Sequence, residues 1–497
     1  MASIPFLWAE KLVTLVGGTN EHTLRLIPLF AGILVLVLLW TVGRRALGKE
    51  GAVVAICLGA FSSLLISYTT AVKQYCTDAV VTLLLLWLVL EVLRAGGSRA
   101  AWWRLAIGGA AAMWLSLPAV FVLVGAVVAL PASPAVRAVP AWRRRYALTT
   151  LAWAGAFALI YVLVYHAGER NAYLQEFWEP TFLTPGAPDF LRRARRAARL
   201  ILEPPLVGTG DLLPNVHFVL GGLTSAAFLA GLVSIFRTRG PSLALLCAGP
   251  YVAMLGAAMI GTYPPANRLL LFAAPLLFFI YASALCWAVQ AFPPRARGPA
   301  LALALAVLTL WRYPGAVEEA LHPQRGRATK TLVRAIEARA PDAPVYLLTP
   351  GFECFCSVWA FYSTDWSAPD TSRLRWFART TAEMADTGSI AAAMSFTGRR
   401  RQDLIGAGAR LQYVRGAKWS PPEPDGVWVE RESERVRRAA NPVAWLWATE
   451  TYPEAAIAHL LHGIRQRGGR LIFAAQAPGA ATWEVEFSPE RGAQSPR

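Results

Sequence analysis

The chain has 497 residues, of which 55% are hydrophobic and only 16% are charged, and its net charge is +17. This charged fraction and a mean hydropathy of +0.41 exclude an ordinary soluble protein. The basic residues separate apolar runs instead of forming one patch, which argues against nucleic-acid binding. Cys354 and Cys356 have no second cysteine pair, and His459 and His462 have no third ligand, so no metal site is predicted.

Apolar runs close to the roughly 20 residues that cross a bilayer predict a polytopic α-helical membrane protein. These runs occupy residues 26–42, 52–70, 79–93, 104–130, 146–166, 213–236, 242–262, 267–292 and 299–313. The motif Ser116-Leu117-Pro118 is expected to divide 104–130 into two short helices, because proline interrupts a helix. We therefore expect an amphipathic segment over 1–23, a bundle of about nine to ten helices over 24–313 and a separate domain over 314–497.

Short loops rich in Lys and Arg mark the cytoplasmic side of a membrane protein. The residues that would share this side are Arg44, Arg45, Lys49, Arg94, Arg99, Arg104, Arg137, Arg143, Arg144, Arg145, Arg237, Arg239, Arg295 and Arg297. The outer side then receives the segment 1–23, the segment 67–78, a long loop over 167–212, the turn 262–268 and everything after 314. An outer N-terminus needs either a tail that crosses unaided or a transmembrane helix upstream of Met1, and we expect the second.

The segment Ser67–Ala79, SYTTAVKQYCTDA, places polar residues between two apolar runs. Polar and ionisable groups at a membrane edge are costly unless they have a function. This segment therefore predicts a polar site at the mouth of the helical bundle.

Five short motifs, in their order and spacing, resemble bacterial integral-membrane glycosyltransferases of the GT-C superfamily, near the family 39 protein mannosyltransferases and the lipid A aminoarabinose transferases. The motifs are Pro5–Trp8, Gly18–Gly32, Tyr68–Asp78, Ser116–Phe121 and Tyr263–Pro275. The resemblance covers residues 1 to 313. It implies a GT-C-like bundle in the bacterial inner membrane that transfers a hexosyl or pentosyl group from a polyprenyl-phosphate donor to a lipid, glycan or protein acceptor on the outer face, without a cofactor. It also implies an acidic general base after the family's first transmembrane helix, and this base has no counterpart in the chain.

Three charged residues are the candidates for the chemistry. Lys73 would contact the donor phosphate, or would only extend to the lipid headgroups. Arg268 would bind the same phosphate through its guanidinium, or would only anchor a helix at the interface. Asp78 resembles the second acid of the aminoarabinose-transferase pattern and is the catalytic candidate, which would orient a cation or the acceptor; alternatively, it caps a helix.

Four other residues, Tyr68, Tyr75, Glu176 and Trp178, are expected to line the substrate site, although the two tyrosines would equally suit an interfacial aromatic belt. The following sequence, FLRRARRAARLIL over 190–202, predicts an amphipathic basic helix. Such a helix would lie on anionic headgroups or form one wall of an entrance for the lipid phosphate.

The residues after 314 predict a small α/β domain outside the membrane. Strands are expected over 345–349, 409–414, 441–448, 471–475 and 481–487, with a helix between Thr451 and Gly468. This domain lacks a phosphate loop, so we expect it to bind the acceptor or to pack against the bundle.

Two other functions remain open for the whole chain: an inactive homologue that holds a lipid-linked sugar or an intact partner, and a transporter. The few charges at mid-membrane depth argue against the transporter.

Overall fold

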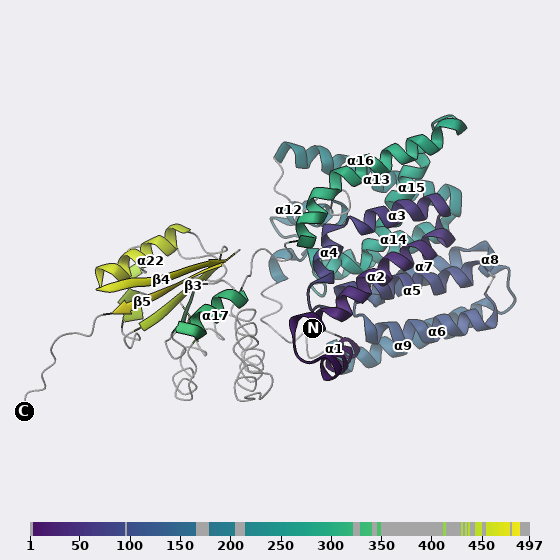
Figure 1. Ribbon diagram of the computed structural model, residues 1–497. Helices are drawn as coiled ribbons and strands as arrows, with labels where there is room; N and C mark the ends of the chain where they lie inside the picture. Colours follow the sequence, from purple (N-terminus) through teal and green to yellow (C-terminus); the bar gives the residue numbers. More distant parts are fainter. Residues whose placement is uncertain are drawn as a thin grey trace, which may run out of the picture. The chain divides into compact units, whose positions relative to one another are not determined.

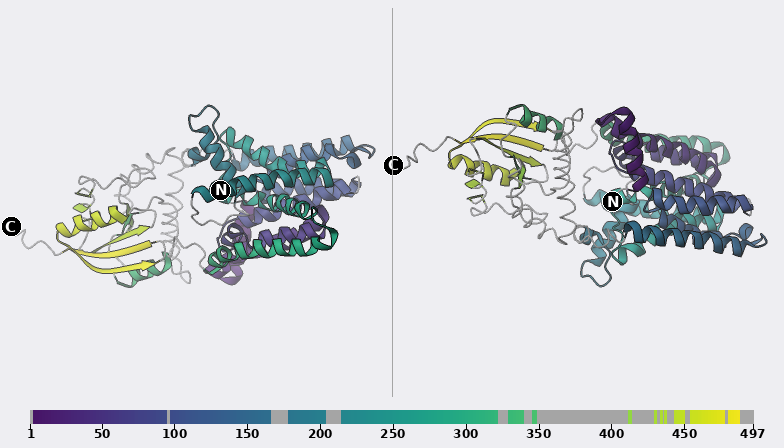
Figure 2. Two further views of the ribbon diagram at one scale, coloured as in Figure 1. Left: turned by 90° about the horizontal axis from the view of Figure 1, so that it is seen from above. Right: turned by 90° about the horizontal axis from the view of Figure 1, so that it is seen from below.

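The computed structural model of the protein describes residues 3–94, 97–165, 178–203, 214–321, 329–339, 345–348, 411–413, 429–430, 433–434, 436–437, 443–449, 454–477 and 480–487. The chain forms two compact units, one of residues 1–170 and 177–323, the other of residues 171–176 and 324–497. The first unit is helical and the second contains a sheet (Figures 1 and 2).

The helices of the first unit are α1 (Ile4–Gly17), α2 (Glu21–Ala46), α3 (Lys49–Ala60), α4 (Ser63–Thr69), α5 (Tyr75–Arg94), α6 (Arg99–Leu115), α7 (Ala119–Ala132), α8 (Pro134–Arg137), α9 (Trp142–Ile160), η1 (Tyr161–Tyr165), η2 (Glu179–Thr181), α12 (Phe190–Leu202), α13 (Pro214–Arg239), α14 (Pro241–Met259), η3 (Asn267–Ala273), α15 (Ala274–Val289) and α16 (Pro294–Leu321). Among the described residues, seven helices are long and apolar enough to cross a membrane, and the bent pair α3 and α4 would add an eighth. The predicted polytopic helical fold is confirmed.

Two breaks divide the apolar runs of the bundle. The predicted break at Ser116–Pro118 is confirmed, because α6 ends at Leu115 and α7 begins at Ala119. The sequence analysis treated residues 52–70 as one apolar run, but this run forms two helices. Helices α3 and α4 meet at an angle of 61° across Phe61 and Ser62, where the Ser62 hydroxyl accepts a hydrogen bond from the Leu65 amide and starts α4.

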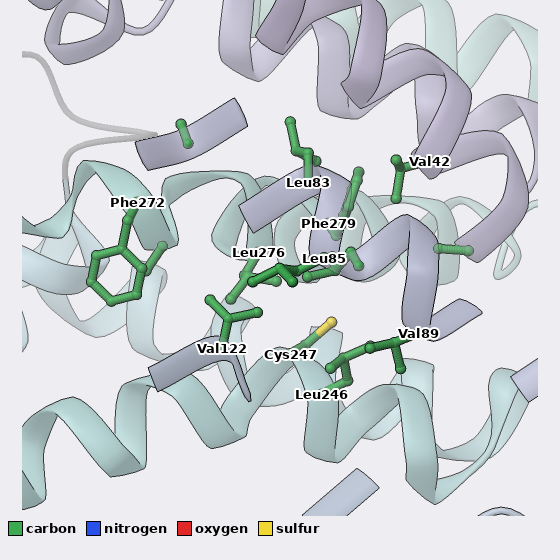
Figure 3. Packing of buried hydrophobic residues seen from close by; sticks show 14 of the residues in the cluster. Val42, Leu83, Leu85, Val89, Val122, Leu246, Cys247, Phe272, Leu276 and Phe279 are labelled. Carbon is green, nitrogen blue, oxygen red and sulfur yellow. The ribbon is translucent and has the colours of Figure 1, made fainter. Parts of the chain in front are cut away.

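The core lies between α2, α5, α7, α14 and α15. Val42, Leu83, Val122, Leu246 and Phe279 come from these five helices and pack together in it (Figure 3). The span Tyr75–Arg94 has 67% of its most apolar stretch buried and the span Arg268–Val289 has 78%, against 11% for α16. The most enclosed spans therefore carry the predicted site residues at their first turns, which fixes these residues firmly in place.

Residues at the predicted cytoplasmic ends lie beside one another. Arg94 donates a hydrogen bond to the carbonyl oxygen of Arg45 at 2.7 Å, and Arg239 donates one to Leu47. Arg145 donates to Gly97 at 2.6 Å. These basic residues thus gather at one end of the bundle, and the segment 67–78 and the turn 262–268 lie at the other end.

The second unit contains a five-stranded sheet in the order β2-β1-β3-β5-β4. Its strands are β1 (Val345–Leu348), β2 (Leu411–Tyr413), β3 (Val443–Thr449), β4 (Gly469–Ala477) and β5 (Ala480–Phe487). β1 pairs in parallel with β2 and β3, whereas β5 pairs antiparallel with β3 and β4. Two helices, α17 (Thr329–Arg339) and α22 (Glu454–Gln466), accompany the sheet, and the predicted small α/β unit is confirmed.

Candidate functional site

The turn between α4 and α5 brings two predicted tyrosines together. Tyr68 lies near the end of α4 and Tyr75 is the first residue of α5. Their ring centroids are 4.9 Å apart and the ring planes are inclined by 75°, an edge-to-face contact. Both side chains are half-buried and rest against the bundle core. The hydroxyl groups therefore share one wall at this end of the bundle.

Arg268 is the cation next to this wall. It is the second residue of η3, and its guanidinium lies close enough to act electrostatically on the phenols of both Tyr68 and Tyr75. On another side the guanidinium carbon lies 5.3 Å from the ring centroid of Trp178. Four of the predicted site residues are thus brought together, although they come from three separate parts of the sequence.

Asp78 lies one turn below Tyr75. Its side chain is only 3% exposed, and Oδ1 has no hydrogen-bond partner among the described residues. Ser116, from the break between α6 and α7, lies close enough to interact with the carboxylate. The alternative that Asp78 caps a helix is wrong, because α5 begins three residues earlier. A buried carboxylate with so few partners needs a proton or a cation, which suits a group that meets a charged ligand.

Lys73 and Gln74 adjoin Tyr75 but differ in exposure. The Lys73 side chain is exposed, in keeping with either of its predicted positions. Gln74 is buried, and its Oε1 accepts a hydrogen bond from the Ser3 amide at the start of α1. This bond attaches α1 to the turn that carries the site. Glu176, the remaining predicted lining residue, lies outside the described residues.

Aromatic residues from two of the resemblance motifs pack together around the turn that precedes Arg268. Phe121 lies 4.8 Å from Tyr263 and 5.8 Å from Phe272, measured between ring centroids. The Tyr263 hydroxyl donates a hydrogen bond to the Leu269 carbonyl at 2.8 Å. The turn before η3 is therefore packed against the start of α7. This packing holds the backbone from which the Arg268 side chain extends.

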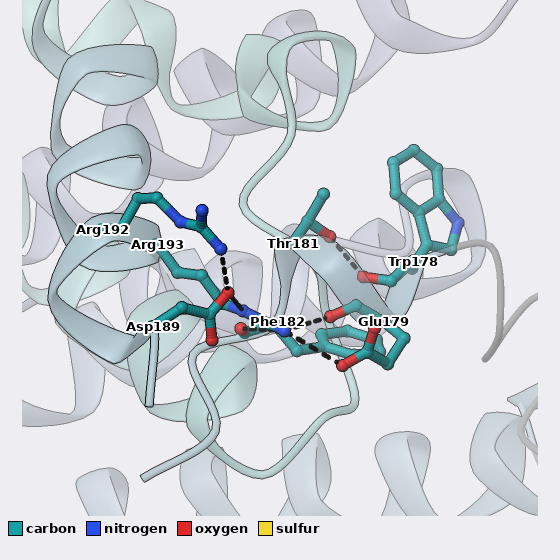
Figure 4. A network of polar contacts seen from close by, with 7 residues as sticks. All are labelled: Trp178, Glu179, Thr181, Phe182, Asp189, Arg192 and Arg193. Carbon is teal, nitrogen blue, oxygen red and sulfur yellow. Dashed lines mark hydrogen bonds and ion pairs between the residues drawn. The ribbon is translucent and has the colours of Figure 1, made fainter. Parts of the chain in front are cut away.

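Arg193 of α12 holds the segment that carries Trp178 (Figure 4). Its guanidinium donates hydrogen bonds to the Glu179 carbonyl at 2.6 Å and the Phe182 carbonyl at 3.3 Å, and pairs with Asp189 at 2.9 Å. The hydrogen bonds from Arg193 and Arg192 lower the pKa of Asp189 to about 2. The charged form of Asp189 is thus kept at all physiological pH values, and with it the position of the segment.

Two charged residues at this end of the bundle are buried, although the sequence analysis did not include them among the candidate site residues. Glu10 of α1 is 7% exposed, neither of its carboxylate oxygens has a hydrogen-bond partner among the described residues, and burial raises its pKa to about 7. Arg312 of α16 is 4% exposed and donates two hydrogen bonds to the Phe61 carbonyl at 3.2 and 3.0 Å. The spacing of Phe6 and Glu10, four residues apart on one buried face, is the only sequence signal for Glu10.

Within the described ranges, no three His, Cys, Asp or Glu side chains gather in a way that would hold a metal ion. The predicted site residues contribute two cations at this end, Arg268 and Lys73, and the buried acid Asp78. Cations of this kind stabilise a departing phosphate, and the paired aromatic rings offer flat, partly apolar surface.

Residues 3–166 match the family model described as dolichyl-phosphate-mannose-protein mannosyltransferase. None of the curated proteins matches the sequence. Among solved structures, the chain is similar to ArnT from Cupriavidus metallidurans bound to undecaprenyl phosphate, with 12% identity over 97% of this chain and 87% of that chain and a TM-score of 0.48. It is also similar to the oligosaccharyltransferase AglB from Archaeoglobus fulgidus in complex with an inhibitory peptide and a dolichol-phosphate, with 13% identity over 97% of this chain and 66% of that chain and a TM-score of 0.46.

Proposed function

We propose that this chain is a glycosyltransferase of the GT-C superfamily, a proposal supported by the match of residues 3–166 to the mannosyltransferase family model. It would transfer a sugar from a polyprenyl-phosphate donor to an acceptor on the outer face of a bacterial inner membrane. The sugar, a hexose or a pentose, and the acceptor, a lipid, a glycan or a protein, are left open by the proposal. The multi-pass helical bundle is the part that would hold the prenyl chain.

One observation carries the proposal: Arg268 and Trp178, from outside the matched residues, meet Tyr68 and Tyr75, from inside them, next to the buried Asp78. A cation between aromatic rings at the end of a membrane bundle suits a ligand with a phosphate, a sugar ring and an apolar tail. The phosphate would pair with the guanidinium, and the sugar would lie against the rings.

The transfer step requires a change at the anomeric carbon of the donor sugar. A bond forms between this carbon and the acceptor oxygen, and the bond from the carbon to the phosphate oxygen breaks. The polyprenyl phosphate leaves with the bonding electrons, and the acceptor proton passes to a base. Arg268 and Lys73 would stabilise the departing phosphate, and Asp78 would orient the acceptor or a cation.

The positive-inside rule supports an outer location for the site. The basic residues that contact one another, including Arg45, Arg94 and Arg239, lie at the end of the bundle opposite the site. Since Lys and Arg in short loops mark the cytoplasmic side, the site end would face outward. The α/β unit, which follows α16, would then lie outside as well.

A donor-consumption assay tests the proposal. The purified protein is incubated with undecaprenyl-phosphate-linked sugars and membrane extracts as acceptor source, and release of undecaprenyl phosphate is measured. We expect Asp78→Asn and Lys73→Ala to lower the rate by about 10²-fold. The matched controls are Lys11→Ala and Glu50→Gln, which change charges that are not part of the site.

The inactive-homologue alternative makes a different prediction in the same assay. It requires undecaprenyl phosphate to bind, with Arg268→Ala weakening the binding, while no donor is consumed by any variant. Consumption that is unchanged in Asp78→Asn, Lys73→Ala and Arg268→Ala would contradict the proposed site. A protein that neither binds nor consumes the donors would contradict the proposed function.

A further inference from the structure

Helix α12 does not present its apolar side to the membrane, as a free amphipathic helix would. Ala197 and Ile201 are buried, and Ala197 packs in a cluster with Leu183 and Ala258 of the bundle. At the far end of the helix, the Leu202 carbonyl accepts a hydrogen bond from the Tyr281 hydroxyl at 2.7 Å. The bundle therefore already occupies the apolar face, and only the basic face remains for another partner.

The remaining face consists of Leu191, Arg192, Arg195, Arg196 and Arg199, and we name it the arginine face. The Arg192 side chain is 81% exposed and Leu191 is 70% exposed, and the other three residues are exposed as well. Arg192 pairs with Asp189 and Arg199 with Glu203. Across the described part of the chain, no carboxylate pairs with Arg195 or Arg196.

The arginine face lies at the depth where lipid headgroups are expected. The segment before α12 is joined to the end of α14 by a hydrogen bond from the Leu183 amide to the Ala258 carbonyl at 3.1 Å. Ala258 is the penultimate residue of this span. The Tyr281 hydroxyl, which holds the other end of the helix, also lies 3.4 Å from the carbonyl oxygen of Thr224, the sixth residue of the span Val219–Arg239. The helix thus begins level with the end of α14 and ends near the first turns of the span Val219–Arg239, next to the level of the headgroups.

We infer that the arginine face binds the anionic headgroups of membrane phospholipids. Each exposed arginine near an anionic membrane surface adds attraction to it, and a guanidinium has five N–H donors, so Arg192 and Arg199 can contact a phosphate while keeping their carboxylate partners. Leu191, exposed beside them, would insert between the headgroups as the apolar part of the contact. This inference does not depend on sugar transfer.

Hydrogen exchange of the full chain in lipid nanodiscs tests the inference. The probe is phosphatidylglycerol mixed into phosphatidylcholine, compared with phosphatidylcholine alone. We expect slower exchange of the α12 amides with phosphatidylglycerol, and a loss of this protection in Arg195→Gln/Arg196→Gln. Titration of the detergent-solubilised protein with phosphatidylglycerol, followed by native mass spectrometry, should show binding weakened by about fivefold for each arginine removed.

Two further variants distinguish binding by the arginine face from an effect of the protein's total charge. Arg195→Lys/Arg196→Lys keeps the charge and should retain most of the binding, whereas Arg334→Gln/Arg465→Gln removes two exposed charges from the other unit and should leave binding unchanged. Equal exchange in both lipid mixtures would overturn the inference. So would binding that survives in Arg195→Gln/Arg196→Gln, and so would equal protection by soluble glycerol phosphate, which would indicate a site for small anions.

Discussion

The guanidinium carbon of Arg268 lies 5.3 Å from the centroid of the Trp178 ring. The two residues are separated in sequence by α12, α13 and α14, and the contact joins η3 to the segment that Arg193 holds. A cation against an indole face keeps its charge and its remaining N–H donors while its range of positions narrows. Arg268 is thereby directed toward Tyr68 and Tyr75 before any ligand arrives.

The first prediction concerns this contact. Arg268→Ala should lower donor consumption by about 10²-fold, because a phosphate-stabilising cation is lost. Trp178→Ala should lower it only about two- to fivefold, since the charge remains and only its positioning weakens. Arg295→Ala, which removes an exposed arginine at the second position of α16, is the control. A larger effect from Trp178→Ala than from Arg268→Ala would contradict the assigned roles.

The second prediction concerns the network around Asp189. Its lowered pKa means that the ionised, paired form is complete above the ordinary pKa of about 3.9 and is lost only as the pH falls through about 2. Hydrogen exchange of residues 178–190, corrected for intrinsic rates, should therefore not change between pH 5 and 8. Asp189→Asn should raise exchange there at neutral pH, because Arg193 loses its charged partner.

Arg192→Gln provides the matched control for this network. Arg192 bonds to the same oxygen of Asp189 at 2.9 Å, but it is far more exposed than Arg193 and, among the described residues, makes no hydrogen bond to the carbonyl groups of the segment. Its removal should leave the exchange of residues 178–190 nearly unchanged. If Arg192→Gln and Arg193→Gln had equal effects, the segment would not be held by Arg193 in particular.

The third prediction concerns Glu10. Its folded pKa of about 7 lies above the ordinary value, so the folded state binds the proton more tightly than the unfolded state does. Stability should accordingly fall as the pH rises from about 4.5 to about 7 and then level off. Glu10→Gln should remove this dependence and raise stability at pH 8 by about 2–3 kcal/mol. Thermal unfolding across this pH range measures the effect, and Lys11→Gln, next to Glu10 but exposed, should keep the wild-type profile.

The fourth prediction concerns the contact between α13 and α15. A Cβ atom added at Gly231 would overlap the carbonyl oxygen of Ile280, and one turn away the Ser283 hydroxyl donates a hydrogen bond to Ser234 at 2.9 Å. Gly231→Ala should therefore separate the helices and cost about 1–3 kcal/mol of stability. Gly222→Ala in the same helix, where no atom lies within 4 Å, should have no such cost. Equal melting temperatures for both variants would contradict the close approach.

Features encoded locally could be predicted from the sequence. The apolar runs predicted the helices, Pro118 predicted the break after Leu115, and short segments after residue 314 predicted the strands of the α/β unit. The order of these strands could not be predicted, because β1 pairs with β2 and β3 across long stretches of chain. Such pairings depend on packing that no single window of sequence contains.

The candidate site was likewise predictable only in its local parts. Sequence motifs indicated Tyr68, Tyr75, Arg268 and Trp178 separately, and the fold brings them together. The burial of Glu10 was not predictable, because α1 carries little apolar periodicity and its position depends on the bond from Ser3 to Gln74. The roles of Lys73, Asp78 and Arg268 in transfer remain predictions that the variants above address.

The two hydrogen bonds from Arg312 to the Phe61 carbonyl join residues that are 251 positions apart in the chain. During synthesis, α3 and α4 enter the membrane long before α16 is made, so the carbonyl at their bend must first be satisfied by water or by another donor. Insertion of α16 then replaces that donor with a guanidinium. α16, the last membrane-length apolar helix among the described residues, thus completes the hydrogen bonding at the bend between α3 and α4, so its arrival is a late step in the biogenesis of the bundle.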